Sequence, residues 1–366
     1  MPTLRDPPLD LLPTTPSALS RALRLLGVRR GPALALATEY RIPGEERVVE
    51  ELIEEMLTMS RRRDGAGPPM RGAHPKQTGC LEAEFTVSDS IPAALRVGLF
   101  ARPGTYKALL RYSNTAPRVQ PDRVTDVRGV AIKVMDICAG GRSLLGDDDQ
   151  DFLLSSAPAL ATCDIRDFLA LTRADLHSHL LWYFFDPRKR NLWKLGVPLS
   201  APSQSFASPA DYRYWSVSAY LLGGGQAVKY AVVPRHPQAI SRSDRRADNH
   251  LHEDLERQLR GHALTMDFLV QRQLDADAMP IEDLSVRWDE RRSPFIKVAT
   301  IRAPRQELGA ALRERADRAS FNAWRCLPEH RPLGSVNRAR RHIYEALNRE
   351  RLRRRAERGG NASTRG

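Results

Sequence analysis

Between residues 80 and 155 the hydrophobic pattern repeats every two residues, and this feature constrains the fold more than any other. The segment L-E-A-E-F-T-V at residues 81–87 alternates apolar and polar side chains, as a half-buried strand does. Four further segments also have the pattern of strands: residues 96–101, 106–113, 127–136 and 151–155. Because short links join these segments, the pattern predicts an antiparallel sheet or barrel.

Helical segments flank this region. Residues 45–63 are amphipathic, with acidic residues first and basic residues last, which is the order that the helix dipole favours. The remaining expected elements are helices at 165–175, 179–193 and 249–259, and strands at 214–220, 226–233, 263–271 and 295–301. The triplet at residues 223–225, Gly-Gly-Gly, predicts a hairpin between the first two of these strands. We therefore expect an α+β fold.

Composition restricts the class of protein. The chain has 366 residues, of which 42% are hydrophobic, enough for a folded core. No run is long enough for a membrane helix, and no signal peptide is evident. The four cysteines match no metal or redox spacing, so we expect reduced thiols in a cytoplasmic protein.

The net charge of +13 raises nucleic acid as a partner, and a basic nucleic-acid-binding protein is one alternative. Basic residues are spread widely, however, and no nucleic-acid-binding motif accompanies them, so no specific nucleic acid is expected. We expect three parts: an N-terminal arm at 1–44 with one short helix at 17–26, a folded domain at 45–351, and a basic flexible tail at 352–366.

A helix is predicted at residues 333–351, and it carries an unusual stripe. Arg340 and Tyr344 are four residues apart and Arg351 is seven further on, so all three lie on one face. A neighbouring guanidinium favours the phenolate form of tyrosine, and a phenolate is a ligand for ferric iron. The second arginine suits a carboxylate. The simpler alternative is a half-buried tyrosine between solvated arginines.

Peroxide chemistry on such an iron needs a neutral base opposite the tyrosine. His74, in R-G-A-H-P-K just before the first strand, is the candidate, since histidine can accept and return a proton near neutral pH. We expect it to face inward over a cavity where the barrel begins. The alternative is a plain loop histidine.

Several motifs, in this order, resemble those of the heme-dependent catalase superfamily. Arg71, His74, Lys76 and Gly79 are similar to the family's R-x-x-H-A-K-G stretch, although Pro75 replaces alanine. The later motifs are L-R-Y-S-N at 110–114, D-V-R-G-V-A-I-K at 126–133, D-F-L-L-S-S-A-P at 151–158 and R-x-x-x-Y at 340–344. The sequence motifs that follow the barrel strands resemble those of the shorter, catalase-like bacterial branch of this superfamily.

The resemblance implies an antiparallel β-barrel of the catalase type with flanking α-helices and a C-terminal proximal helix. It also implies heme b, a heme catalase or peroxidase-type oxidoreductase activity on hydrogen peroxide or organic hydroperoxides, and leaves a homo-oligomer open. The roles it implies are as follows: Tyr344 as proximal iron ligand, Arg340 as its stabilising partner, His74 as proton shuttle, Ser113 orienting that histidine, and Arg71, Arg111 and Arg351 as propionate ligands.

The chain departs from the family on the distal side. Ser155 and Ser156 stand where the family has an asparagine, and a serine hydroxyl is a shorter donor. Ala159 and Leu160 stand where aromatic residues are usual. These changes predict a roomier pocket that favours organic hydroperoxides over dismutation. Two alternatives stay open, a non-catalytic heme-binding homologue and a hydroperoxide isomerase of the allene oxide synthase type.

Overall fold

The computed structural model describes residues 34–138, 142–177, 179–185, 208–236 and 247–363. The helix expected at 17–26 lies outside the described residues, as does most of the helix expected at 179–193. Of the latter, α4 (Leu180–Phe185) is described.

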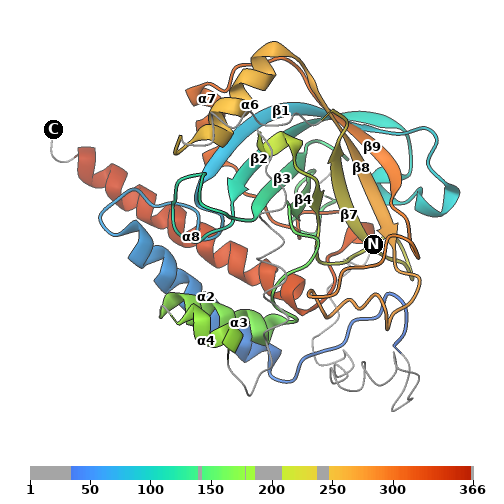
Figure 1. Cartoon of the computed structure of the whole chain (residues 1–366), viewed down its shortest axis with the longest axis horizontal. Helices are drawn as coiled ribbons and strands as arrows, with labels where there is room; N and C mark the ends of the chain where they lie inside the picture. The colour runs from blue at the N-terminus through green and yellow to red at the C-terminus, as the bar shows by residue number, and fades with distance from the viewer. Residues whose placement is uncertain (1–33, 139–141, 178, 186–207, 237–246, 364–366) are drawn as a thin grey trace.

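The centre of the molecule is a closed antiparallel barrel (Figure 1). Neighbouring strands follow the order β5-β4-β3-β2-β1-β9-β8-β7, and pairing of β5 with β7 closes the ring of eight. The strands are β1 (Gln77–Val87), β2 (Gly104–Asn114), β3 (Arg128–Val134), β4 (Gln150–Ser155), β5 (Tyr214–Trp215), β7 (Ala227–Pro234), β8 (Leu264–Arg272) and β9 (Ile296–Ala303). The short β6 (Tyr220–Leu221) forms the predicted glycine hairpin with β7. The predicted α+β barrel fold is confirmed.

Aromatic side chains fill the interior of the barrel. The rings of Phe152 and Phe268 have centroids 4.7 Å apart, and Phe85 and Tyr230 lie 5.2 and 5.5 Å from Phe268. Because strand residues alternate between the two faces, the polar residues between these inward side chains point out of the barrel. The barrel interior is therefore a packed core.

Helices cover the outside of the barrel in two groups. The first group is α2 (Glu45–Asp64), α3 (Ile165–Leu176), α4 and α8 (Ser335–Ser363), which lie together on one side (Figure 1). An apolar cluster that includes Leu52, Leu169 and Ile343 joins α2, α3 and α8. The second group, α6 (His250–Gly261) and α7 (Ala310–Arg318), covers β1. None of the described helices has a stretch long and apolar enough to cross a lipid bilayer.

Two local predictions were wrong, and one helix was missed. The strand expected at 96–101 is replaced by the 3-10 helices η2 (Ala93–Leu95) and η3 (Gly98–Phe100), whose hydrogen bonds are local and whose Gly98 has a φ of 55°. The strand expected at 214–220 is interrupted at Val217, which has a φ of 60°. The helix α7 was not predicted, and two further 3-10 helices are η6 (Pro209–Asp211) and η8 (Pro328–His330).

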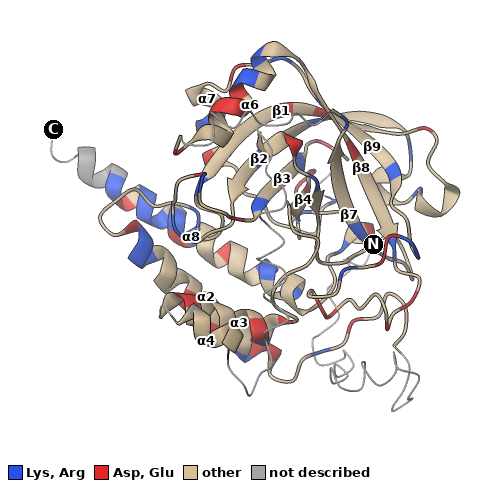
Figure 2. Ribbon diagram, in the orientation of Figure 1, with Lys and Arg blue, Asp and Glu red and all other residues tan. Residues whose placement is uncertain are grey.

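The C-terminal helix is longer than predicted. It was expected to end at Arg351, but α8 continues to Ser363 through the residues expected to form a tail. Figure 2 shows basic residues along the part of this segment that is not drawn grey. Arg353 forms ion pairs with Glu350 and Glu357 on the same helix, and Arg354 pairs with Asp64 at the end of α2. Neighbouring carboxylates thus hold part of this basic segment.

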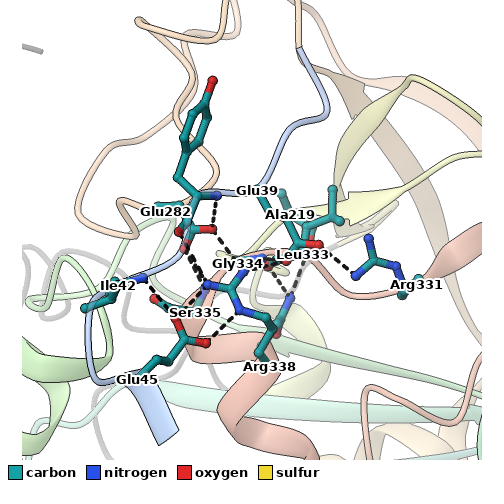
Figure 3. A network of polar contacts seen from close by, with 12 residues as sticks. Glu39, Ile42, Glu45, Ala219, Glu282, Arg331, Leu333, Gly334, Ser335 and Arg338 are labelled. Carbon is teal, nitrogen blue, oxygen red and sulfur yellow. Dashed lines mark hydrogen bonds and ion pairs between the residues drawn. The ribbon is translucent and has the colours of Figure 1, made fainter. Parts of the chain in front are cut away.

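A buried ionic network fixes the start of α8 (Figure 3). Arg338 donates to Glu39, Glu45 and Glu282 over 2.6–3.0 Å. Glu39 and Glu282 also accept the backbone N–H groups of residues 334 and 335. Anionic groups at a helix N-terminus are favoured by the helix dipole. Part of the predicted N-terminal arm is thus buried against α8, since the side chain of Glu39 is 3% exposed.

Candidate functional site

One cavity of about 360 Å³ lies between the outer face of β2–β4 and the helices α3 and α8. Its size is within the range of small-ligand sites. All eight residues that the sequence pointed to line this cavity: Arg71, His74, Arg111, Ser113, Ser155, Arg340, Tyr344 and Arg351. The cavity is outside the barrel, so the expectation that His74 faces inward was wrong. Aromatic side chains fill the barrel interior, so a ligand cavity cannot lie inside the barrel.

Small residues on three neighbouring strands form the floor of the cavity. Ser113 on β2 is paired with Gly129 on β3, and Gly129 is paired with Ser155 on β4. Arg111 on β2 and Ala131 on β3 are each two residues from this first row. They are paired with each other and belong to the next row on the outer face. Strand alternation places both rows on the outer face. The register of the sheet thus makes a flat, small-residue floor with a basic residue at one side.

His74 lies directly on this floor. Its Nδ1 is 3.1 Å from the Ser113 hydroxyl, and a Cβ atom on Gly129 would come within 2.7 Å of its ring. Only glycine leaves this space. His74 also has a φ of 52°, in the left-handed region, and Arg111 donates to its carbonyl oxygen over 2.9 Å.

Burial, with the charges of Arg111 and Arg340, lowers the pKa of His74 to about 4. The imidazole is therefore neutral at pH 7. With Nδ1 bonded to Ser113, its Nε2 is the nitrogen available to a ligand. A neutral imidazole in this position can accept a proton.

Three arginines gather at one end of the cavity, and their hydrogen-bond partners are all neutral. Arg71 donates to two backbone carbonyls at the end of α7. Arg111 donates to the carbonyl of His74, and Arg351 donates to a backbone carbonyl and to Asn348. Within the part of the chain that the structure describes, none of the three forms an ion pair with a carboxylate.

The burial of these arginines lowers the pKa values of two of them. Burial and the charges of Arg111 and Arg351 lower the pKa of Arg71 to about 8, and burial lowers that of Arg111 to about 10. The Nε atoms of Arg71 and Arg111 are buried and have no hydrogen-bond partner among the described residues. Buried charges are normally paired. This end of the cavity therefore fits an anionic ligand with more than one oxygen.

The helix α8 forms the opposite wall. Tyr344 lines the cavity, and within the described residues its hydroxyl makes no hydrogen bond. Arg340 was expected to stabilise the Tyr344 phenolate, and this role stays a prediction; among the described residues Arg340 donates no hydrogen bond to Tyr344. It donates instead to Ser218 and Asn337 over 3.2 and 3.1 Å. The guanidinium is thus one helical turn from the tyrosine and is held by neutral groups.

The structure distinguishes between the two serines at the end of β4. Ser155 lines the cavity, whereas the Ser156 hydroxyl accepts the backbone N–H of Arg128 and is outside the lining. Ala159 and Leu160 do line the cavity, as expected. The small side chains on this side leave room for a ligand of some bulk.

Sequence reasoning missed several lining residues. Phe168 on α3 and Phe321 in the loop after α7 both contribute aromatic surface, and Phe321 lies under the guanidinium of Arg71 at 5.5 Å. Asn348 lines the cavity between Tyr344 and Arg351. Asn348 could have been found, because it is four residues beyond Tyr344 on the same stripe. No cluster of three or more His, Cys, Asp or Glu side chains among the described residues could hold a metal ion.

Comparison with known proteins identifies the fold. No protein-family model matches the chain, and no curated protein matches it. Three similar solved structures are a fungal catalase, catalase A from Saccharomyces cerevisiae and a bacterial catalase. Their TM-scores are 0.63, 0.64 and 0.61 at 15%, 16% and 14% identity, over 88% of this chain. The chain spans 66%, 68% and 63% of their lengths. The chain thus has the fold of catalases.

Proposed function

We propose that the protein is a catalase-like heme enzyme that cleaves peroxides in this cavity. The observation that carries the proposal is the convergence of three groups on one space. A neutral histidine is held over a flat floor, and three arginines and the tyrosine of α8 line the same cavity. Among the described residues, these arginines form no ion pair with a carboxylate and the tyrosine hydroxyl makes no hydrogen bond. These residues come from the segment before β1, from β2 and from α8.

The cavity lining fits a heme. The cavity between this strand floor, which His74 covers, and α8 would hold the planar ring. The arginine cluster would bind the propionates, because bidentate carboxylates would satisfy the orphan Nε atoms and neutralise the buried charge. Tyr344 would ligate the iron. When bound, a heme supplies the redox chemistry that breaks the O–O bond of a peroxide.

The proton movements would belong to His74. Its neutral imidazole would take the proton from the peroxide oxygen nearest to Nε2 and return it to the leaving oxygen. Ser113 would keep the ring oriented through Nδ1, and Gly129 would keep it close to the floor. Arg111, by holding the backbone of His74, would link the base to the cofactor end of the cavity.

Organic hydroperoxides are the substrate class that the distal side favours. Dismutation requires a second small peroxide to be held firmly, and Ser155 offers only a short hydroxyl that already accepts the N–H of Ala157. Ala159, Leu160 and Phe168 provide apolar surface for a substrate chain. The loss of one well-placed hydrogen bond costs about 1–3 kcal/mol, which is about ten- to a hundredfold in rate.

The first test is the absorption spectrum of the full chain reconstituted with hemin. We expect a Soret band and a phenolate-to-iron charge-transfer band, with most of the heme lost in Tyr344→Phe. Arg47→Gln, at an exposed residue of α2, is the control and should load normally. A Tyr344→Phe protein with an unchanged spectrum would disprove the ligand assignment.

The second test compares oxygen release from hydrogen peroxide with the consumption of cumene hydroperoxide in the presence of a reducing co-substrate, which supplies the two electrons for each O–O bond cleaved. We expect weak oxygen release and faster organic peroxide consumption, both lost in His74→Ala. Ser155→Asn should raise oxygen release relative to cumene hydroperoxide consumption. A loaded protein that consumes no peroxide would instead select the non-catalytic alternative, and rearrangement without a reductant would select the isomerase.

The other sequence-based expectations remain predictions. These are the cytoplasmic location, the homo-oligomer and the division at residues 44 and 351. A colourless preparation with a salt-dependent mobility shift on nucleic acid would favour a binding protein without heme.

A further inference from the structure

Arg340 is a cation that lines the cavity and, among the described residues, donates only to neutral groups. Its Nη1 donates to the Ser218 hydroxyl at 3.2 Å and to Asn337 Oδ1 at 3.1 Å. Both partners are neutral, and no Asp or Glu among the described residues forms an ion pair with it. By contrast, Arg338, two residues earlier on the same helix, is surrounded by three glutamates. One helix thus carries a neutralised arginine and an uncompensated one.

The orientation of Asn337 is fixed by its other contacts. Its Nδ2 donates to the backbone carbonyls of Ala219 and Leu333 at 3.0 and 3.1 Å, so both amide hydrogens are used. The carbonyl oxygen therefore points to Arg340 and Ser218, and the amide cannot flip without losing four hydrogen bonds. Asn337 is fully buried. Such an amide is a fixed acceptor that carries no charge.

The position of Ser218 depends on a strained turn. The preceding residue, Val217, lines the cavity with a φ of 60°, which a β-branched residue rarely adopts. Ser216 donates its hydroxyl to the carbonyl of Ser218 at 2.9 Å and closes the turn. Strain of this kind persists where the surroundings over-determine it, often at functional sites. The turn brings the Ser218 hydroxyl to both Asn337 and Arg340.

We propose that Ser218 and Asn337 are positioning residues that hold Arg340 as an uncompensated cation beside Tyr344, so that its field acts on the iron ligand. This inference rests on the proposed function. Neutral acceptors orient a guanidinium without cancelling its charge, and in a site that excludes water this charge acts strongly over several ångströms. A carboxylate in the same place would orient Arg340 equally well but remove most of its field.

The reach of this field is seen in two other residues. The charge of Arg340 contributes to the lowered pKa of His74, on the opposite wall of the cavity. It also opposes the rise that burial imposes on the pKa of the Tyr220 hydroxyl. Tyr344, one turn away, lies within the same reach. With a heme bound, a cation there would weaken electron donation from the phenolate and would raise the reduction potential of the iron.

A double-mutant cycle on the hemin-loaded full chain tests the inference. Ser218→Ala, Arg340→Leu and the double variant are compared with the wild type by the iron(III)/iron(II) potential and the charge-transfer band. If Ser218 acts through Arg340, Ser218→Ala shifts both quantities in the wild-type background and neither in the Arg340→Leu background. Equal shifts in both backgrounds would overturn the inference. Ser293→Ala, which removes a buried hydroxyl outside the cavity lining, should shift neither.

Asn337→Asp tests the sign. It has nearly the same shape and places a carboxylate against Arg340, although it loses the two hydrogen bonds that Nδ2 donates, so the potential should become more negative than in the wild type. A potential that stays the same or rises would contradict the role of the neutral partner, even if heme occupancy falls.

Failure of the proposed function is recognised separately, by a hemin spectrum that does not depend on Tyr344. The positioning is then decided in the heme-free protein, from the nitrogen resonances of the Arg340 guanidinium. Rotation about the Cζ–Nη1 bond should be slow in the wild type and faster in Ser218→Ala. Equal rotation rates in the two proteins would show that Ser218 does not hold the arginine.

Discussion

The two walls of the cavity are built in different ways. On the barrel side, Ser113, Gly129 and Ser155 are placed by the hydrogen-bonded register of three adjacent strands, and His74 rests on them. On the helix side, every functional group is on one helix, and distant segments fix the start of that helix. Arg338 of α8 is bound to Glu39 and Glu282, which are 299 and 56 residues away in sequence.

We therefore expect mutations in the two walls to have different effects. The barrel wall is set by many backbone hydrogen bonds, so a single side-chain change there should act locally. The helix wall depends on a few buried charges, so loss of one charge should act on the whole helix. Removing one partner of a buried ionic group leaves uncompensated charge, whereas changes at exposed pairs cost little.

The largest effect is expected at Arg338. Arg338→Leu leaves Glu39, Glu45 and Glu282 buried without their shared cation, and should lower the free energy of unfolding by about 3–5 kcal/mol. Urea denaturation measures the change. Hemin affinity should fall as well, since Tyr344 is on the same helix.

The matched control is Arg47→Leu, which breaks the exposed pair with Glu51 and should change the unfolding free energy by about 0–1 kcal/mol. If Arg338→Leu is no more destabilising than this control, the ionic network does not fix the helix wall.

A smaller, local effect is expected at Gly129. In Gly129→Ala the new Cβ would come within 2.7 Å of the His74 ring and 3.2 Å of the Ser113 hydroxyl, so the ring has to move. We expect peroxide cleavage to slow by about ten- to a hundredfold, because one orienting hydrogen bond is lost, with little change in stability. Steady-state kinetics with cumene hydroperoxide measure it. Gly224→Ala, where no atom lies within 4 Å, should leave the rate unchanged.

The smallest effect is expected from pH. With a His74 pKa of about 4 rather than the usual value of about 6.5, the base stays neutral as the pH falls through 6. The cleavage rate should fall by only about a tenth at pH 5, with a midpoint near 4. Because the unfolded chain binds this proton at higher pH, His74 stabilises the fold fully above pH 6.5 and progressively less as the pH falls towards 4. A rate midpoint near 6.5 would show that the ring is not buried as described.

The two walls also differed in how far sequence could predict them. Period-two alternation placed Arg111 and Ser113 on the same face of a strand, and helical spacing placed Arg340, Tyr344 and Arg351 on one stripe. Both patterns are local, and the structure brings all these residues to one cavity. Their chemical roles remain predictions.

What sequence could not provide depends on contacts across long separations. Asn337 and Ser218 are 119 residues apart, and neither belongs to a pattern that points to the other. The segment at 96–101 had the composition of a strand, but Leu99 donates its N–H to the buried ring of His330 instead of to a neighbouring strand. Tertiary partners decided both cases.

The spacing of residues on α8 sets the length of a ligand that can contact both Tyr344 and Arg351. Tyr344 and Arg351 are seven residues apart, so the helical rise sets them about 10.5 Å apart along the axis, with almost no rotation between them. A ligand that binds both must match this length between its metal centre and its anionic edge. Inserting or deleting one residue between them would turn Arg351 by about 100° away from the cavity. This part of the chain should therefore accept substitutions more readily than changes in length.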